Sequence, residues 1–174
     1  QIQSQLIDYI DILPENVHTF PGDLPKETVF TFCEEYEKAI ADAGGIDIQV
    51  LGIGQCGNIA MNEPGTQPNS STRLVIMDNN SRVDAKSLFG NVAQVPTCAI
   101  TLGIETILKA KEVILVAFGQ HKASIVKQAI EEVASAECPA SYLQLHKNAS
   151  IVLDLDAANK LTRINHPWKV TNCE

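Results

Sequence analysis

Hydrophobic positions along the chain follow two spacings, one typical of helices and one typical of buried strands. Apolar residues recur every three or four positions over residues 26–43 and stop at a pair of glycines, which predicts an amphipathic helix. Short continuous apolar runs over 46–53 and 113–118 predict parallel strands buried on both faces. Helices and strands alternate, so we predict an α/β fold with a three-layer, Rossmann-like open sheet that is mainly parallel. If the chain is a fragment, we expect this domain to be incomplete.

Shorter patterns predict the remaining elements. Strands are expected over residues 17–20, 73–78 and 149–154. Helices are expected over residues 1–12, 97–108 with Thr97 as N-cap, and 121–133, and shorter helical turns over 79–91, 141–146 and 156–161. The helix after the second buried strand begins close to Lys122, so its first amides and that ammonium would form a site for an anion such as phosphate.

The segment over residues 46–66 is the one around which the rest is organised. Its apolar strand breaks into a loop that contains glycines at 52, 54 and 57, followed by the polar side chains Asn58, Asn62 and Glu63. Ligands of open α/β sheets bind beyond the carboxyl ends of the strands, and glycine there lets the backbone approach them. This loop is therefore the predicted site.

Composition and charge narrow the class of partner. The chain has 174 residues, 45% of them hydrophobic, and a net charge of −8, which suits one domain and argues against a nucleic-acid or anionic-membrane surface. We expect a small-molecule partner, no cofactor and no metal, because no His/Cys cluster has zinc spacing. No apolar run is long enough to span a membrane and no leader is recognisable, so we expect a cytoplasmic protein with reduced thiols at Cys33, Cys56, Cys98, Cys138 and Cys173.

The ends of the chain suggest a piece of something longer. Residue 1 is a glutamine that lies directly in an apolar helical pattern, so we expect a missing N-terminal segment. We place the domain over residues 1–163 and a linker or tail over 164–174, with Trp168 as its one large anchor. A truncated sheet has an unpaired edge, which invites association into a homo-oligomer.

The loop sequence GIGQCGNIAMNEPG, starting at Gly52, resembles the signature of the glucosamine-6-phosphate deaminase/isomerase family, in a sugar-phosphate isomerase superfamily shared with 6-phosphogluconolactonase. TLGIETILKAKEVILVAFGQHKA is similar to a second conserved block of that family, and YLQLH to a third. The resemblance covers nearly the whole chain as the C-terminal portion of the family. GIGxxG alone also fits a nucleotide-binding turn, but the NEPG run that follows indicates a loop and not a helix.

The resemblance implies the conversion of glucosamine 6-phosphate to fructose 6-phosphate and ammonia. In that chemistry a histidine helps to open the sugar ring, an aspartate moves a proton between two carbons, and acidic partners tune the histidine. This chain has Cys56 and Asn58 at the family's catalytic aspartate and histidine positions and retains Glu63. The family's proton-transferring aspartate and first phosphate loop lie upstream of the match, so we expect this chain to be inactive alone.

The same residues allow plainer interpretations. Glu63 is either a retained catalytic carboxylate or a loop cap, Asn58 either a hydrogen-bonding replacement or a simple loop residue, and Cys56 either an activated thiol or an inert one. The resemblance assigns substrate binding to Gly54, Gly57, Asn62 and Lys122, with a turn-forming role for the third and a surface role for the last as alternatives. The family's substrate-phosphate arginine position is Ser87 here.

Three functions remain open at this point. The first is a deaminase/isomerase-like protein that binds a sugar phosphate. The second is a non-catalytic sugar-phosphate-binding or subunit-contact module, which the residues at 56 and 58 favour. The third is a hydrolase like 6-phosphogluconolactonase, from which the NEPG run points away.

Overall fold

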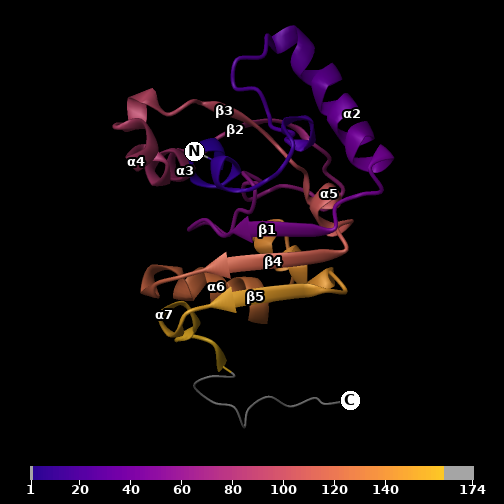
Figure 1. The fold of residues 1–174 in the computed structure, drawn as a ribbon. Coiled ribbons are helices and arrows are strands. Elements are labelled where there is room, and N and C mark those ends of the chain that lie inside the picture. The colour runs from indigo at the N-terminus through magenta and orange to yellow at the C-terminus, as the bar shows by residue number, and fades with distance from the viewer. Residues whose placement is uncertain (1, 163–174) are drawn as a thin grey trace.

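The parallel sheet is the centre of the structure. A computed structural model describes residues 2–162 (Figure 1). Its main sheet has the order β1-β4-β5, with β1 at Ile48–Gly52, β4 at Glu112–Ala117 and β5 at Ala149–Leu153, and both pairings are parallel. The expected mainly parallel α/β fold is confirmed. Since Gly52 pairs with Val116, the loops after β1 and β4 leave the same edge of the sheet.

One face of this sheet packs against helices and forms the core. Leu51, Val113 and Leu115 point to this face, because side chains alternate along each strand. They pack in one cluster with residues from α5 (Ile104–Leu108), α6 (Ala123–Glu131) and the 3₁₀ segment η5 (Pro139–Leu145). In Figure 1, α6 lies behind the sheet. Burial of these apolar side chains is the main contribution to the stability of the fold.

The opposite face of the same sheet is open. Ile48, Val50 and Val152 are 57%, 61% and 47% exposed on it. Figure 1 shows this face toward the viewer, and within residues 2–162 no helix covers it. The third layer expected from the sequence is therefore not supplied by the described residues.

A small antiparallel ribbon lies beside the main sheet. It consists of β2 (Arg73–Ile76) and β3 (Cys98–Thr101), which pair from Arg73 with Thr101 to Ile76 with Cys98. The helix predicted over 97–108 is therefore wrong in its first half and correct only at α5. The apolar residues over 98–101 fit the spacing of a helix or of a strand. Their backbone hydrogen bonds to β2 stabilise the strand.

The N-terminal predictions are corrected as well. Instead of a helix over 1–12 there is one turn, α1 (Ile2–Gln5), and the 3₁₀ segment η1 (Ile7–Tyr9). Residues 17–20 form no strand, and a 3₁₀ turn, η2 (Pro14–Asn16), precedes them. The apolar side chains of this segment have little to pack against, and Tyr9 is 81% exposed. A helix whose apolar stripe is not buried lacks the packing that would stabilise it.

The other predicted elements are present. α2 runs over Lys26–Asp42, and the short helices α3 (Asn79–Asp84), α4 (Lys86–Phe89) and η3 (Val92–Gln94) lie within or next to the predicted turns. α6 is preceded by a 3₁₀ turn, η4 (Gln120–Lys122), and α7 (Leu155–Ala158) follows β5. The linker or tail predicted over 164–174 lies outside the described residues.

The Glu37 carboxylate joins α2 to the ribbon and to α5. Its Oε1 accepts hydrogen bonds from the Thr72 amide at 2.7 Å and from the hydroxyls of Thr72 and Thr106, each at 2.5 Å. Burial of the carboxylate raises its pKa, but these bonds and the positive charge of Lys109 outweigh burial, so the pKa of Glu37 is lowered. The charged form is therefore the one that holds the three elements together.

We predict that Glu37→Gln lowers the free energy of unfolding at pH 7 by about 1 kcal/mol, a small value because the side chain is partly exposed. A lowered folded pKa stabilises the protein fully above the unfolded pKa of about 4.3 and loses this effect as the pH falls through the folded value. The difference between variant and wild type in urea unfolding should therefore shrink below about pH 4. Glu34→Gln, at an exposed residue of the same helix, is the control and should show neither effect.

Candidate functional site

The loop after β1 is shaped by two glycines. The Gly54 amide donates to the Asn58 carbonyl at 2.9 Å, and the Asn58 side chain folds back over Gly54 so closely that a Cβ there would lie 1.9 Å from Oδ1. Gly57 has a φ of +79°, and a Cβ on it would lie 2.5 Å from Cys138 Sγ. The backbone conformation of Gly57 requires glycine there, and glycine at position 54 leaves room for the Asn58 side chain.

A hydrogen-bonded chain connects the polar side chains of the loop. Asn58 Nδ2 donates to Ser81 Oγ at 3.3 Å, and the Ser81 hydroxyl donates to Glu63 Oε1 at 2.5 Å. Ser81 is on α3, and its amide is capped by the Asp78 carboxylate at 2.9 Å. The structure therefore brings together Gly54, Asn58 and Glu63, and it adds Ser81, which sequence reasoning missed. The only sequence signal was the run of capping residues at the start of that predicted turn.

Glu63 also has an unused acceptor. Its Oε2 is buried and has no hydrogen-bond partner among the described residues. A buried carboxylate oxygen without a donor costs free energy, and such orphans are rare in folded proteins. A donor from a ligand or from another polypeptide would satisfy it.

Cys56 lies on the same loop, on the side of α3. Asn80 Nδ2 donates to its Sγ at 3.5 Å, and the thiol is only partly exposed. The thiols of Cys33 and Cys138 are buried, and burial is the main cause that raises the pKa of each. Those two thiols are therefore poor nucleophiles.

Asn62 lies beneath the loop and not on its surface. Its side chain is 0% exposed, and Nδ2 donates to the carbonyls of Ile59 at 3.0 Å, Ala60 at 3.3 Å and Leu102 at 2.8 Å. Arg73 Nη1 donates to its Oδ1 at 2.9 Å. Each polar atom of the amide is thus hydrogen-bonded within the protein.

The backbone next to Asn62 is strained. Ala60 and Met61 have φ values of +46° and +57°, in the left-handed region that residues with a Cβ rarely adopt. Such residues persist where surrounding contacts fix them, and the Asn62 amide bonds the carbonyl of Ala60 directly. The loop is therefore held in one conformation by its own buried asparagine.

Lys122 follows β4 at the same edge of the sheet, at the end of η4. Its side chain is partly exposed, and within residues 2–162 its ammonium makes no hydrogen bond or ion pair. The nearby Gly119 amide already donates to both oxygens of the Asp154 carboxylate, at 2.9 and 3.0 Å. The same carboxylate caps α7. The predicted anion site is thus reduced to the Lys122 ammonium and the remaining free amides of this turn.

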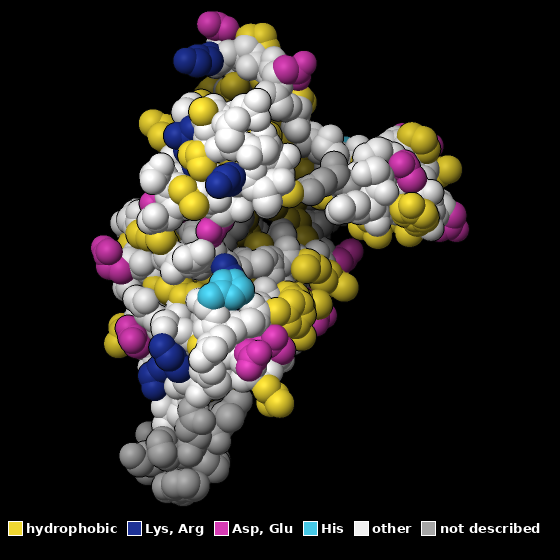
Figure 2. Space-filling model, turned by 90° about the vertical axis from the view of Figure 1, so that its left-hand side faces the viewer, with side chains coloured by type: hydrophobic (Ala, Val, Ile, Leu, Met, Phe, Trp, Pro, Cys, Tyr) yellow, Lys and Arg dark blue, Asp and Glu magenta, His cyan; other side chains and the backbone are white. Residues whose placement is uncertain are grey.

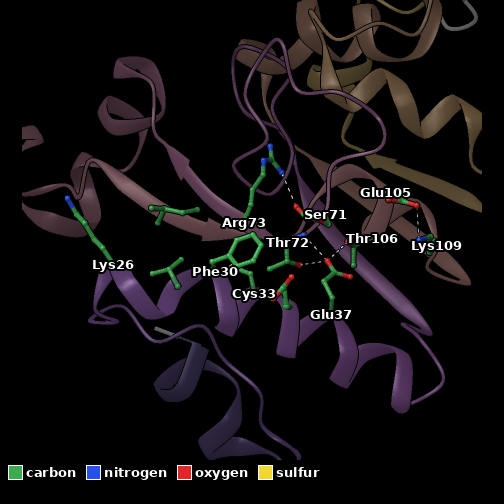
Figure 3. A pocket seen from close by; sticks show the side chains of 13 residues that line it. Lys26, Phe30, Cys33, Glu37, Ser71, Thr72, Arg73, Glu105, Thr106 and Lys109 are labelled. Carbon is green, nitrogen blue, oxygen red and sulfur yellow. Dashed lines mark hydrogen bonds and ion pairs between the residues drawn. The ribbon is translucent and has the colours of Figure 1, made fainter.

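A cavity lies away from this loop. A cavity of about 680 Å³ is bounded by α2, β2 and α5, and Figure 3 shows Phe30 and Cys33 of α2 facing it, with Arg73 pointing away toward Ser71. It contains none of the site residues predicted from the sequence. The loop after β1 and this cavity are separate features. No group of three or more metal-ligating side chains occurs among the described residues, and no described helix is long and apolar enough to cross a membrane.

We predict that Asn62→Ala lowers the free energy of unfolding by about 2 to 3 kcal/mol, because three carbonyls and the Arg73 guanidinium lose a buried partner. Urea unfolding measures this difference. Asn69→Ala, an exposed residue of the same connection, is the matched control and should change stability by less than about 0.5 kcal/mol. Equal stabilities of the two variants would contradict a supporting role for Asn62.

Comparison with known proteins identifies related sequences. The chain is 48% identical, over 99% of its length, to a glucosamine-6-phosphate deaminase-like protein of Bacteroides thetaiotaomicron, of which it covers 26%. It is 46% identical to the glucosamine-6-phosphate deaminase of Shewanella loihica over 92% of the chain and 59% of that protein. The chain therefore spans less than two thirds of the length of these relatives.

Solved structures agree with this relationship. A monomeric glucosamine-6-phosphate deaminase superposes with a TM-score of 0.87 at 33% identity, covering 91% of this chain and 65% of the other. A 6-phosphogluconolactonase from Trypanosoma brucei has a TM-score of 0.60 at 22% identity over 82% of this chain and 57% of its own, which shows a shared fold alone. The family description "Glucosamine-6-phosphate isomerases/6-phosphogluconolactonase" matches residues 1–152, and the chain belongs to this family.

Proposed function

We propose that this chain is the sugar-phosphate-binding part of a glucosamine-6-phosphate deaminase/isomerase-like protein of amino-sugar metabolism. The observation that supports this most is the convergence of the Gly54–Glu63 loop with Ser81, where a carboxylate, an amide and a hydroxyl lie in one hydrogen-bonded chain at the carboxyl end of β1. Hydroxyl-rich ligands are recognised by such groups. The names of relatives at 46% to 48% identity point to the same substrate class.

The ligand would lie across the edge shared by β1 and β4. Glu63 and Asn58 would hydrogen-bond sugar hydroxyls, and the Lys122 ammonium would contact the phosphate. Because β1 and β4 are neighbours in register, the two loops start side by side. The free thiols of the described residues suit a reducing compartment, so we place the protein in the cytoplasm.

We also propose that the chain by itself does not catalyse the deamination. An asparagine amide cannot exchange a proton as the family's histidine does, and Cys56 stands where the family has an aspartate. Proton transfer needs a titratable group within reach of the sugar, and Glu63 is the one carboxylate of this loop. Binding and catalysis are thus separated in this chain.

We predict that the isolated chain releases no ammonia above background from glucosamine 6-phosphate, because the acid/base groups are missing. A coupled ammonia assay over hours, with the Shewanella loihica deaminase as positive control, measures this. Ammonia release by wild type that Glu63→Gln abolishes would contradict the proposal and identify Glu63 as catalytic.

We predict that glucosamine 6-phosphate raises the melting temperature of wild type and that Lys122→Ala weakens its binding at least about tenfold, the loss expected for one charge-assisted contact to phosphate. Titration calorimetry measures the affinity. Lys147→Ala, an exposed lysine just before β5 at the opposite edge of the sheet, is the control and should bind like wild type. No binding by wild type, or equal losses in both variants, would contradict the site.

A further inference from the structure

The cavity beside α2 has the size and the mixed lining of a small-molecule site. Its volume is about 680 Å³, and it is bounded by α2, β2 and α5. Figure 2 shows the face at the carboxyl ends of the strands, where the proposed sugar-phosphate site lies and where the surface has a deep indentation. The cavity shares no lining residue with the loop after β1 or with Lys122. It is therefore a separate site.

One wall of the cavity is apolar. Val29, Phe30 and Cys33 come from one side of α2, and Leu74 of β2 contributes a further apolar side chain. Val29 and Cys33 are buried, whereas Phe30 and Leu74 are 73% and 43% exposed. Figure 3 shows Phe30 facing the cavity. An exposed aromatic ring beside a hollow offers apolar surface that a ligand can cover.

The polar end of the cavity presents acceptors. The Oε1 of Glu37 accepts the amide and the hydroxyl of Thr72 and the hydroxyl of Thr106, and Figure 3 shows these bonds meeting at Glu37. Its Oε2 accepts no hydrogen bond from the described residues, and unlike the Oε2 of Glu63 it is not buried. Both hydroxyl protons are used in these bonds, so the two threonines offer only lone pairs to a ligand.

The charges around Glu37 favour a cation. The Lys109 ammonium is paired with the Glu105 carboxylate at 2.8 Å. Two carboxylates and one ammonium therefore leave one net negative charge at this end of the cavity. Lys26 lies three turns earlier on α2, roughly 16 Å away along the helix axis, and Arg73 points away from the cavity in Figure 3. An anion such as a phosphate would find no unpaired cation beside Glu37.

We propose that this cavity binds a small organic cation, a primary ammonium carried on an apolar chain or ring. The ammonium donates to the Oε2 of Glu37, and the apolar part lies against Val29, Phe30 and Leu74. An ammonium has three protons and no acceptor, so it matches an end of the cavity that offers acceptors only. Its charge-assisted bond to the carboxylate selects it over a neutral ligand of the same shape.

Three probes of similar size and different charge test this proposal: phenethylamine, phenethyl alcohol and phenylacetate. Amide chemical-shift titrations of the chain at pH 7, where the amine is protonated, give the affinity and the location of each probe. We expect phenethylamine to shift the amides of Thr72 and Thr106 and to bind at least about tenfold more tightly than the alcohol. Phenylacetate should bind more weakly still. Equal affinities for amine and alcohol, or shifts only outside the cavity, would overturn the proposal.

Two variants separate the charge from the apolar wall. Glu37→Gln should weaken phenethylamine at least about tenfold and leave the alcohol unchanged, because it removes the charge and keeps the shape. Phe30→Ala should weaken both probes by the same factor, since it removes a contact that they share. Glu35→Gln, at an exposed residue of α2 outside the cavity lining, is the control and should bind like wild type. Circular dichroism sets a temperature at which all variants are folded.

The test also distinguishes this site from the proposed function. Glucosamine 6-phosphate should not displace phenethylamine, and its affinity should be the same for wild type and Glu37→Gln. Displacement, or phenethylamine binding that Glu37→Gln does not weaken, would overturn the cation site. Failure of glucosamine 6-phosphate to bind, with phenethylamine binding intact, would refute the proposed function alone.

Discussion

The buried amide of Asn62 is the interaction on which the candidate site depends. One side chain fixes its own loop through Ile59 and Ala60 and attaches that loop to the β3–α5 connection through Leu102. Arg73, the first residue of β2, donates a hydrogen bond to the same amide and so joins the loop to that strand. A buried amide is stabilising only when its polar atoms are hydrogen-bonded, so these contacts are formed or lost together. The left-handed backbone at Ala60 and Met61 is one consequence, because a free loop would relax it.

Other polar anchors extend this frame outward. Glu37 bonds Thr72, the neighbour of Arg73, and Thr106 of α5. Asp78 caps α3 and so sets Ser81 at the distance that Glu63 requires. The two carboxylates at Glu37 and Glu63 therefore have different roles: the first has its donors supplied by the fold, and the second keeps one oxygen buried and unpaired. The loop after β1 therefore differs from the cavity beside α2 in keeping a buried acceptor without a donor among the described residues.

The sequence predicts the central strands and α2 well because their patterns of apolar residues are unambiguous. Residues 46–53 and 113–118 are continuous apolar runs, and α2 has an unbroken helical period with a glycine stop. Residues 98–101 are different, since their spacing suits a helix and their conformation is set by pairing with β2, which no local pattern reveals. Ser81 and the burial of Asn62 were out of reach for the same reason. Both depend on contacts between segments 18 and 40 residues apart.

The apolar pattern of the strands also implies more packing than the described residues provide. A run that is apolar on both sides is expected for a strand with two covered faces, and β1 has only one. The loop is similar: the positive φ of Gly57 and the hydrogen bonds of Asn62 fix its shape, and neither involves the side chains at positions 56 and 58. A cysteine and an asparagine can therefore occupy those positions without loss of the fold. The residues that fix the shape of this loop are therefore not the residues at the two positions where the resemblance expects proton transfer.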